Sequence, residues 1–397
     1  MTRIAYFSPL TPIRSGISDY SEDLLPHLAE LVEIDLFIDD FEPANRALVE
    51  RFDIYSIADY PQRRWDYDIA LYHMGNNLYH EAIYRTALHY PGLVVLHDFA
   101  IVGLLSAVTW GRGDREAFVR EWGYHAGPEG ITRARRIMSG HVKMAPNEPL
   151  NKRLLDVSFG VIVHSDYTRR RVLEVCPLAM VEHIPMLWVS HQPKELTRRT
   201  ARRELGLGNG IYIGSFGFMT PSKGVEPLLD AFVDLLLEFP AAHLVFVGEP
   251  LDWYDPRPLI EARGLTDKVT ITGYIPLSTW HTYMAAIDLA VNLRYPTQGE
   301  TSASVLRLMG AGVPVIVSDL GWYAELPDEC VVKLPISESV SADLKSAVTC
   351  LLSHPEKRAC LSQRSRDYVR AHHAAPQVAR RYVDFIEYIL GCLGTDG

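Results

Sequence analysis

Short apolar runs alternate with longer amphipathic stretches along the first half of the chain. The runs are "RIAYFS" (3–8), "EIDLFI" (33–38), "DIALYH" (68–73), "GLVVLH" (92–97) and "GVIVHS" (160–165). Between the first two runs, residues 19–31 carry leucines at helical spacing. Strand-length apolar runs separated by amphipathic helices are typical of βαβ units around a parallel sheet. The pattern therefore predicts a doubly wound α/β domain.

A second series of the same kind begins after a polar, arginine-rich stretch near residues 187–200. Its runs are "GIYIGSFG" (210–217), "HLVFVGE" (243–249), "KVTITGY" (268–274), "DLAVNL" (288–293), "PVIVSD" (314–319) and "CVVKL" (330–334). We therefore predict one Rossmann-like domain over 1–190 and another over 191–375. Residues 376–397 are predicted to form a last amphipathic helix, which is a candidate to pack back on the first domain.

Composition agrees with this layout and narrows the class of protein. A chain of 397 residues, 48% of them hydrophobic, exceeds what one core usually serves. The net charge of -10 argues against nucleic-acid binding, so we interpret the arginine clusters at 132–136, 168–171 and 198–203 as solvated helix faces. The five cysteines include no CxxC pair and predict neither a disulfide framework nor a zinc site. Without a leader-like start or an apolar run of 18 residues, we expect a cytoplasmic protein.

Two loops that follow predicted strands are candidates for binding a phosphate. The first leads through Gly16 into a helix that we expect Ser18 to cap. In "YIGSFGFMTPSKGVEPLLDAF" (212–232), Gly217 ends a strand and Lys223 begins a helix. A lysine beside a helix N-terminus suits the binding of a diphosphate. The alternative interpretation, given the same weight, is that Lys223 is a solvated lysine in a turn. The first loop contains no GxGxxG, which disfavours a nicotinamide or flavin enzyme. The second loop does not match the spacing of a P-loop.

Several motifs, taken together and in order, resemble a known family. "SFGFMTPSKGVEPLLDAF", "LVFVGE", "KVTITGYIPLSTWHTYMAAIDLAVNLRYP", "GETSASVLRLMGAGVPVIVSD" and "GWYAELPD" are similar to the nucleotide-sugar domain of family 4 retaining glycosyltransferases. "RIAYFSPLTPIRSGISDYSEDLLPHLAE" and "VVLHDF" resemble the acceptor domain of that family. The resemblance implies the GT-B fold, with two Rossmann-like domains facing each other across a cleft. It also implies sugar transfer from a nucleotide diphosphate sugar, with retention and without a metal or another cofactor.

The resemblance assigns the donor side of the site to the second domain. Lys223 and the backbone at Gly217 are expected to contact the diphosphate. Phe218 stands where the family usually has an arginine. Either the phosphates rely on Lys223 and helix dipoles, or another basic residue such as Arg307 or Arg14 compensates. Further donor contacts are expected from the backbone of Tyr274 and Ile275, which matches the segment that reads the nucleobase edge, and from Glu325, with helix bracing as the alternative role of that acid.

The stretch "YPTQGETSASVLRLMGAG" departs from the E-x7-E pattern of the family. Gly299 occupies the place of the first glutamate and Arg307 that of the second, while Glu300 lies one residue away. We expect Glu300 to reach the donor sugar, and the backbone N–H groups of Thr301, Ser302 and Ala303 to face the phosphate or sugar at a helix start. The alternative is that Glu300 and Arg307 only brace the helix.

The first domain is expected to hold the acceptor. His97 in "VVLHDF" matches a histidine that touches the donor sugar in the family, and Asp98 is a candidate to orient that ring or to bind an acceptor hydroxyl. His73, Asn76 and Asn77 in "LYHMGNN" end a neighbouring strand and are further acceptor candidates. Ser165 or Asp166 is expected to cap a helix, and Asp288 is expected to serve at a strand start.

The expected acceptor is a lipid-linked sugar, a polysaccharide precursor or a small metabolite. A lipid acceptor would bring peripheral contact with the inner face of a membrane, for which the segment 104–150, with Trp110 and Trp122, is the candidate patch. Three other functions stay open: a GT-B epimerase or phosphorylase, a dehydrogenase, and a catalytically silent nucleotide-sugar-binding protein. Free nucleoside diphosphate released only with an acceptor would separate a transferase from all of them.

Overall fold

The computed structural model describes residues 1–190 and 196–394, so part of the predicted linker lies outside the described residues. The chain divides into two compact units. Unit 1 comprises Met1–Leu187, Gln298–Thr301 and Ala375–Gly397, and unit 2 comprises Trp188–Thr297 and Ser302–Ala374. The sequence placed the break at residue 190, three residues later, and did not anticipate that a four-residue segment of the second half would belong to unit 1.

Unit 1 is built on a parallel sheet of seven strands in the order β3-β2-β1-β4-β5-β6-β7. The strands are β1 (Arg3–Phe7), β2 (Glu33–Ile38), β3 (Ile54–Ser56), β4 (Ile69–Met74), β5 (Leu93–Leu96), β6 (Gly160–Val163) and β7 (Val181–His183). The sequence pattern missed β3 because this three-residue edge strand is only partly buried and carries no apolar run.

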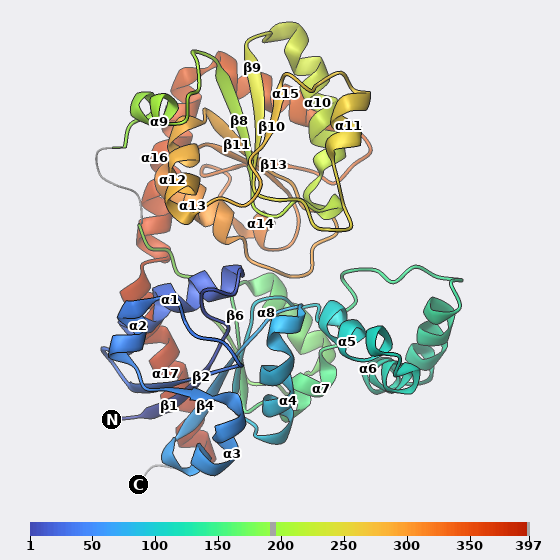
Figure 1. Ribbon diagram of the computed structural model, residues 1–397, viewed down its shortest axis with the longest axis vertical. Coiled ribbons are helices and arrows are strands. Elements are labelled where there is room, and N and C mark those ends of the chain that lie inside the picture. Colours follow the sequence, from blue (N-terminus) through green and yellow to red (C-terminus); the bar gives the residue numbers. More distant parts are fainter. Residues whose placement is uncertain (191–195, 395–397) are drawn as a thin grey trace. The chain divides into compact units, whose positions relative to one another are not determined.

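Helices cover both faces of this sheet (Figure 1). One face holds α1 (Gly16–Leu28), α2 (Arg46–Arg51) and α17 (Ala375–Leu393). The other face packs against α3 (Tyr60–Arg63), α4 (Glu81–His89), α5 (Val102–Val108), α6 (Arg115–Met138), α7 (Lys152–Val157) and α8 (Asp166–Val175). The short 3-10 turns of unit 1 are Ile57–Asp59, Arg64–Asp66, Leu78–His80 and Trp110–Arg112.

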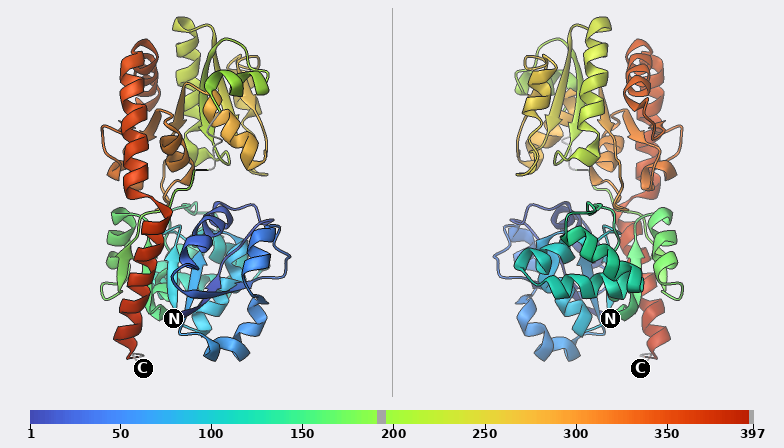
Figure 2. Two further views of the ribbon diagram at one scale, coloured as in Figure 1. Left: turned by 90° about the vertical axis from the view of Figure 1, so that its left-hand side faces the viewer. Right: turned by 90° about the vertical axis from the view of Figure 1, so that its right-hand side faces the viewer.

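The last helix, α17, is an integral part of unit 1. It packs against α1 (Figure 2), and the hydroxyl groups of Tyr20 and Tyr382 lie 2.6 Å apart in this contact. Tyr382 is fully buried. Helix α1 begins one residue after Ser15, whose side chain accepts a hydrogen bond from the N–H of Ile17. The prediction that Ser18 caps this helix was therefore wrong.

Unit 2 has a parallel sheet of six strands in the order β10-β9-β8-β11-β12-β13. The strands are β8 (Ile211–Phe216), β9 (Ala242–Val247), β10 (Val269–Ile271), β11 (Leu289–Asn292), β12 (Val315–Ser318) and β13 (Val332–Leu334). Both units thus have parallel sheets with helices on both faces, and the predicted α/β fold with two Rossmann-like domains is confirmed.

The helices of unit 2 divide between the two faces of its sheet (Figure 1). One face holds α10 (Val225–Glu238), α11 (Arg257–Ala262) and α15 (Val340–Ser353). The opposite face holds α9 (Arg198–Glu204), α12 (Leu277–Ala286), α13 (Ala303–Ala311) and α16 (Pro355–His372). Helix α14 (Trp322–Glu325) follows β12, and the 3-10 turn Pro221–Lys223 precedes α10.

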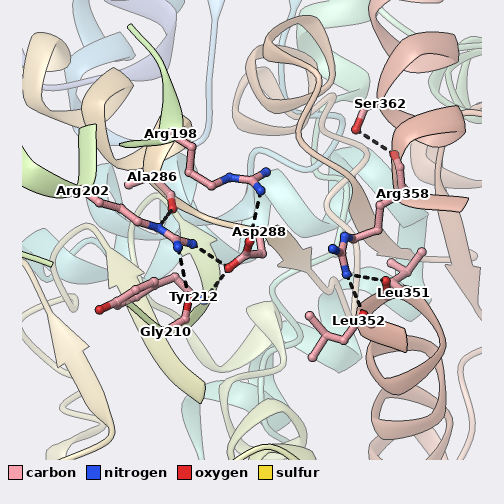
Figure 3. Close-up of polar contacts among 10 residues, drawn as sticks. All are labelled: Arg198, Arg202, Gly210, Tyr212, Ala286, Asp288, Leu351, Leu352, Arg358 and Ser362. Atoms are coloured by element: carbon pink, nitrogen blue, oxygen red, sulfur yellow. Dashed lines mark hydrogen bonds and ion pairs between the residues drawn. The ribbon is translucent and has the colours of Figure 1, made fainter. Parts of the chain in front are cut away.

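Asp288 joins three elements at the amino-terminal edge of the unit 2 sheet (Figure 3). Its Oδ2 accepts hydrogen bonds from Arg202 of α9 at 2.7 Å and from the N–H of Tyr212 at 2.8 Å. Its Oδ1 lies 3.2 Å from Arg198, and Arg202 also donates to the carbonyl oxygen of Ala286. The expectation that Asp288 serves at a strand start is confirmed, and two arginines of the 198–203 cluster are engaged in this network.

Arg358 performs a related task at the turn between α15 and α16 (Figure 3). Its guanidinium donates to the carbonyl oxygens of Leu351 and Leu352 at 2.7 and 2.9 Å. These carbonyl groups belong to the last turn of α15, where helix geometry leaves acceptors without intrahelical partners. Arg358 therefore stabilises the end of one helix from the first turn of the next.

The substitution Asp288→Asn tests the network at α9. We expect the free energy of unfolding of unit 2 to fall by about 2–3 kcal/mol, because each hydrogen bond to a charged group contributes roughly 1.5–3 kcal/mol. Urea unfolding checks the change. Asp255→Asn is the matched control, since the Arg257–Asp255 pair is exposed and such pairs contribute little. Equal losses in the two variants would contradict a stabilising role for Asp288.

Candidate functional site

Lys223 and Gly217 come together where β8 ends. The Lys223 ammonium donates to the carbonyl oxygen of Phe216 at 3.2 Å. A Cβ atom added to Gly217 would lie 2.6 Å from that nitrogen and 3.5 Å from the hydroxyl oxygen of Ser304. Gly217 has a φ of +96°, so the position favours glycine on two grounds. A cation and a hydroxyl group therefore face one stretch of bare backbone.

The turn that carries Lys223 is held firmly against β11. The N–H of Tyr295 donates to the carbonyl oxygen of Ser222 at 2.7 Å. Gly224 has a φ of +63°, and a Cβ atom there would lie 2.8 Å from the Cβ atom of Leu293. Helix α10 begins at the next residue, as the sequence predicted for Lys223 and Gly224. The ammonium group is thus positioned by packing as well as by its own hydrogen bond.

Helix α13 begins beside this group. Ser302 is its N-cap, and the Ser302 hydroxyl accepts from the N–H of Val305 at 3.3 Å. Ser304, which sequence reasoning missed, lies in the first turn and faces Gly217. Of the three residues predicted to offer N–H groups at the helix start, Ala303 begins the helix and Ser302 caps it. Thr301 lies outside the helix, and its hydroxyl donates to the carbonyl oxygen of His164 in unit 1.

Arg307 occupies the second turn of α13, and its guanidinium carbon lies 5.8 Å from the centre of the Trp280 ring. Trp280 also packs edge-on against Phe216 at 5.0 Å. Arg307 therefore has an aromatic neighbour within cation–π distance, a contact that orders the side chain. Whether it compensates for the missing arginine at position 218, as the resemblance suggests, stays a prediction.

The remaining predicted donor residues of unit 2 lie at other strand exits. Tyr274 and Ile275 follow β10, and Tyr274 is exposed. Glu325 ends α14 after β12, two strands away from β8. Burial raises the pKa of the partly buried Tyr368 on α16, and the charges of Cys330 and Glu325 raise it further. Phe218, at the position of the expected arginine, is exposed beside Gly217.

In unit 1, His97 is part of a buried cluster of rings. His97 Nε2 lies 2.9 Å from His73 Nδ1, and its ring centre lies 5.0 Å from that of His164. The ring of Tyr20 packs edge-on against His97 at 4.9 Å. His80 adds a fourth histidine, since its Nδ1 donates to the carbonyl oxygen of His73. The sequence proposed His97 and His73 separately and gave no signal that they touch.

Burial keeps His73, His80 and His97 uncharged. It lowers the pKa values of His97 and His73 well below their usual range, and the proximity of His164 lowers both further. Burial also lowers the pKa of His80 to about 4, against an opposing effect of its backbone hydrogen bond. At neutral pH the cluster therefore offers neutral imidazole groups, which can donate or accept hydrogen bonds.

Asp98 contacts the loop after β4, and its proposed role toward the His97 ring stays a prediction. Its Oδ2 accepts from the N–H of Asn76 at 3.0 Å, while His73 holds the ring. The Asn76 side chain in turn accepts from the N–H of Leu104 and donates to Gln298. Asn77 caps a short 3-10 turn through the N–H of Tyr79. Two of the proposed acceptor contacts thus organise the loop after β4.

Residues 298–301 form a tight turn at the carboxyl edge of the unit 1 sheet. The carbonyl oxygen of Gln298 accepts from the N–H of Ala100, and that of Gly299 accepts from the hydroxyl of Thr168 at 2.7 Å. Glu300 Oε2 accepts from the N–H of Gln298 at 2.7 Å. Glu300 therefore braces its own turn with one oxygen, and it belongs to unit 1, whereas the sequence placed it in the second domain.

Gly16, a candidate position for approach to a phosphate, is the first residue of α1. Gly16 is exposed, and a Cβ atom there would meet nothing within 4 Å. Ser165 caps α8 through the N–H of Thr168, which confirms one of the two predicted caps. Arg14 is exposed in the loop before α1.

Two features are absent from the described residues. No helix among them is long and apolar enough to cross a membrane. No group of three or more histidine, cysteine, aspartate or glutamate side chains among them is arranged to hold a metal ion.

Comparisons with known proteins agree with this fold. Residues 210–354 match the family model described as glycosyl transferases group 1. The α-D-kanosaminyltransferase of Streptomyces kanamyceticus is 26% identical over 190 residues, which cover 47% of this chain and 46% of that protein. A GDP-mannose-dependent phosphatidylinositol monomannoside mannosyltransferase of Mycobacterium tuberculosis is 25% identical over 243 residues, which cover 59% of this chain and 63% of that protein. The matches thus span about half to two thirds of these curated relatives.

Solved structures extend the likeness over nearly the whole chain. HepE from Anabaena in complex with UDP-glucose gives a TM-score of 0.71 at 15% identity, covering 98% of this chain and 100% of that one. Sucrose-phosphate synthase from Thermosynechococcus elongatus gives 0.68 at 17% identity, covering 99% and 100%. The structural neighbours have the GT-B fold. Each unit of this chain is a Rossmann-like domain, as the domains of that fold are.

The histidine cluster predicts how stability depends on pH. The folded-state pKa values lie below the unfolded value of about 6.5, so the unfolded state binds more protons as the pH falls. Stability should be full above about pH 6.5 and should decline toward pH 4. Thermal unfolding at pH 7.5 and 5.0 checks this. His80→Asn should flatten this decline in stability. The control is His89→Asn at an exposed histidine, which should leave the decline as it is. Identical profiles for the two variants would contradict the contribution of the buried histidine cluster.

Proposed function

We propose that this chain is a retaining, metal-independent glycosyltransferase that moves a sugar from a nucleotide diphosphate sugar to an acceptor hydroxyl. The observation that carries the proposal is the meeting of Lys223, Ser304 and the bare backbone at Gly217 beside the first turn of α13. A cation, a hydroxyl group and a helix N-terminus together favour a diphosphate. The match of residues 210–354 to glycosyl transferases group 1 supports the same conclusion.

The chemical step asks mainly for stabilisation of the departing nucleoside diphosphate. Negative charge develops on the bridging oxygen as the bond to the anomeric carbon breaks. Lys223 is already ordered by its bond to the carbonyl oxygen of Phe216, so little reorganisation is needed as that charge appears. With retention, the acceptor hydroxyl attacks on the face from which the diphosphate leaves, and its proton passes to the departing diphosphate oxygen. We assign no protein nucleophile to this step.

We assign the acceptor and the transferred sugar to unit 1. His97 is neutral and fixed by His73, which suits a hydrogen bond to a sugar hydroxyl. The acceptor class stays a sugar, a lipid-linked sugar or a small molecule. The segment proposed for membrane contact does not expose its tryptophans: Trp122 is 2% exposed, and the half-buried Trp110 packs against Phe118. That finding takes the tryptophans out of the expected patch, and peripheral membrane contact stays a prediction.

The test is nucleoside diphosphate release from a panel of nucleotide sugars, with and without sugar acceptors. Release that requires an acceptor supports a transferase, and the anomeric configuration of the product, read by NMR, tests retention. Interconversion of two nucleotide sugars would indicate an epimerase, and phosphate-dependent release of a sugar phosphate would indicate a phosphorylase. Binding without turnover across the panel would favour a silent nucleotide-sugar-binding protein.

Lys223→Ala should lower kcat/KM by the equivalent of roughly 2–4 kcal/mol, because an ordered cation facing the leaving group is lost. Nucleoside diphosphate affinity should fall as well, while the urea unfolding midpoint stays unchanged. The control is Lys268→Ala. Lys268 directly precedes β10, and its ammonium donates to the carbonyl oxygen of Pro240. Unchanged kinetics in Lys223→Ala would remove the diphosphate assignment.

Glu300→Gln separates sugar recognition from bracing. The amide oxygen can still accept from the N–H of Gln298, so the turn should keep its stability. If the carboxylate also holds the donor sugar, the affinity for the complete nucleotide sugar should fall by about 1.5–3 kcal/mol and that for the free nucleoside diphosphate should not. Competition binding measures both. Equal weakening of the two ligands, or of neither, would leave Glu300 with bracing alone.

A further inference from the structure

Four neighbouring strands of unit 2 each end in a loop that exposes a large aromatic side chain. In sheet order, β10, β9, β8 and β11 are followed by Tyr274, Trp253, Phe218 and Tyr295. These side chains are 53%, 71%, 40% and 63% exposed. Aromatic side chains usually bury most of their surface, and exposed ones that gather at a sheet edge indicate a binding surface. We call these four residues the aromatic row.

The centre of the row is fixed by backbone pairing beyond the ends of β8 and β9. The N–H of Gly217 donates to the carbonyl oxygen of Val247, and the N–H of Met219 donates to that of Glu249, both at 2.9 Å. The N–H of Leu251 returns a bond to the carbonyl oxygen of Met219. Phe218 and the loop that carries Trp253 are therefore parts of one hydrogen-bonded ribbon, which gives their exposed rings a rigid base.

Charge distinguishes the β8 and β11 side of the row from the loop after β9. Lys223 lies at β8, and its turn is bonded to the backbone of Tyr295 on the β11 side. The loop after β9, residues 248–256, carries the carboxylates Glu249, Asp252 and Asp255, of which Asp255 pairs with the adjacent Arg257. A diphosphate is attracted to the first place and repelled from the second. The uncharged part of a nucleotide is therefore the part that suits the β9 side.

We propose that Trp253 stacks on the nucleobase of the donor, while Phe218 lies beside the diphosphate. This stacking replaces part of the affinity that a second phosphate-binding cation would supply. The inference rests on the proposed function and adds the residues that distinguish this chain from the family pattern. Phe218 stands where the resemblance predicts an arginine, so the same position exchanges a charge for a ring. Stacking tolerates any base, because every base has a π face.

The experiment is isothermal titration of the full chain with UDP, GDP, ADP, dTDP and inorganic pyrophosphate. Trp253→Ala should weaken the best-binding nucleotide about tenfold and leave pyrophosphate within twofold, since stacking acts on the base alone. Trp253→Phe should restore most of the loss. Lys223→Ala should weaken nucleotide and pyrophosphate alike. Trp65→Ala, at an 80% exposed tryptophan of unit 1, is the matched control and should change neither.

Phe218→Arg gives a second, independent test. Restoring the cation should tighten pyrophosphate and make nucleotide binding fall more steeply with salt, because surface charge contacts are screened. If nucleotide binding by Phe218→Arg depends on salt as it does in the unaltered chain, the proposal that stacking replaces a phosphate-binding cation is wrong.

The outcomes separate the two levels of the proposal. If Trp253→Ala binds nucleotide as the unaltered chain does while Lys223→Ala does not, the stacking role is wrong and the donor site stands. Equal weakening of nucleotide and pyrophosphate by Trp253→Ala would also overturn stacking, since it would indicate a structural role. If the unaltered chain binds none of the nucleotides, the proposed function itself fails.

Discussion

Strands that are covered by helices on both faces can carry few polar side chains along their length. Nearly every residue of β4, β5, β6, β8, β11 and β12 is buried, and these strands consist mainly of aliphatic and aromatic residues. Burying an unpaired polar group costs several kcal/mol in apolar surroundings, so functional groups are confined mainly to the strand ends. Because the strands are parallel, their carboxyl ends share one edge of each sheet. Lys223, His97 and the aromatic row all lie in or just after such ends.

The two sheets use their carboxyl edges in different ways. Unit 2 presents a cation, a helix N-terminus and exposed rings, one of which, Trp253, lies in a loop that carries three carboxylates. Unit 1 presents neutral histidines that are held by one another and by tyrosine rings. The first arrangement discriminates by charge, and the second by hydrogen-bond geometry without charge.

Stability in unit 2 depends on contacts at the other edge of its sheet. The Asp288 carboxylate accepts hydrogen bonds from Arg202 and from the N–H of Tyr212, and it pairs with Arg198. These contacts fix α9 to the starts of β8 and β11. Arg358 joins α16 to the end of α15. These ionic and capping contacts lie away from the carboxyl edge. A substitution there should change stability without changing ligand binding, and this separation makes the binding experiments interpretable.

The sequence by itself predicted both sheets, because alternating apolar runs and amphipathic helices leave little freedom in a doubly wound fold. Its motif order also pointed to Lys223, Gly217 and His97, since a strand exit is local in sequence. Tertiary structure decided what local spacing does not encode. It placed residues 298–301 in unit 1, gave the helix cap to Ser15 and joined His97 to His73 across 24 residues. It also placed four aromatic residues from distant loops in one row, because pairing between parallel strands brings together exits that lie far apart along the chain.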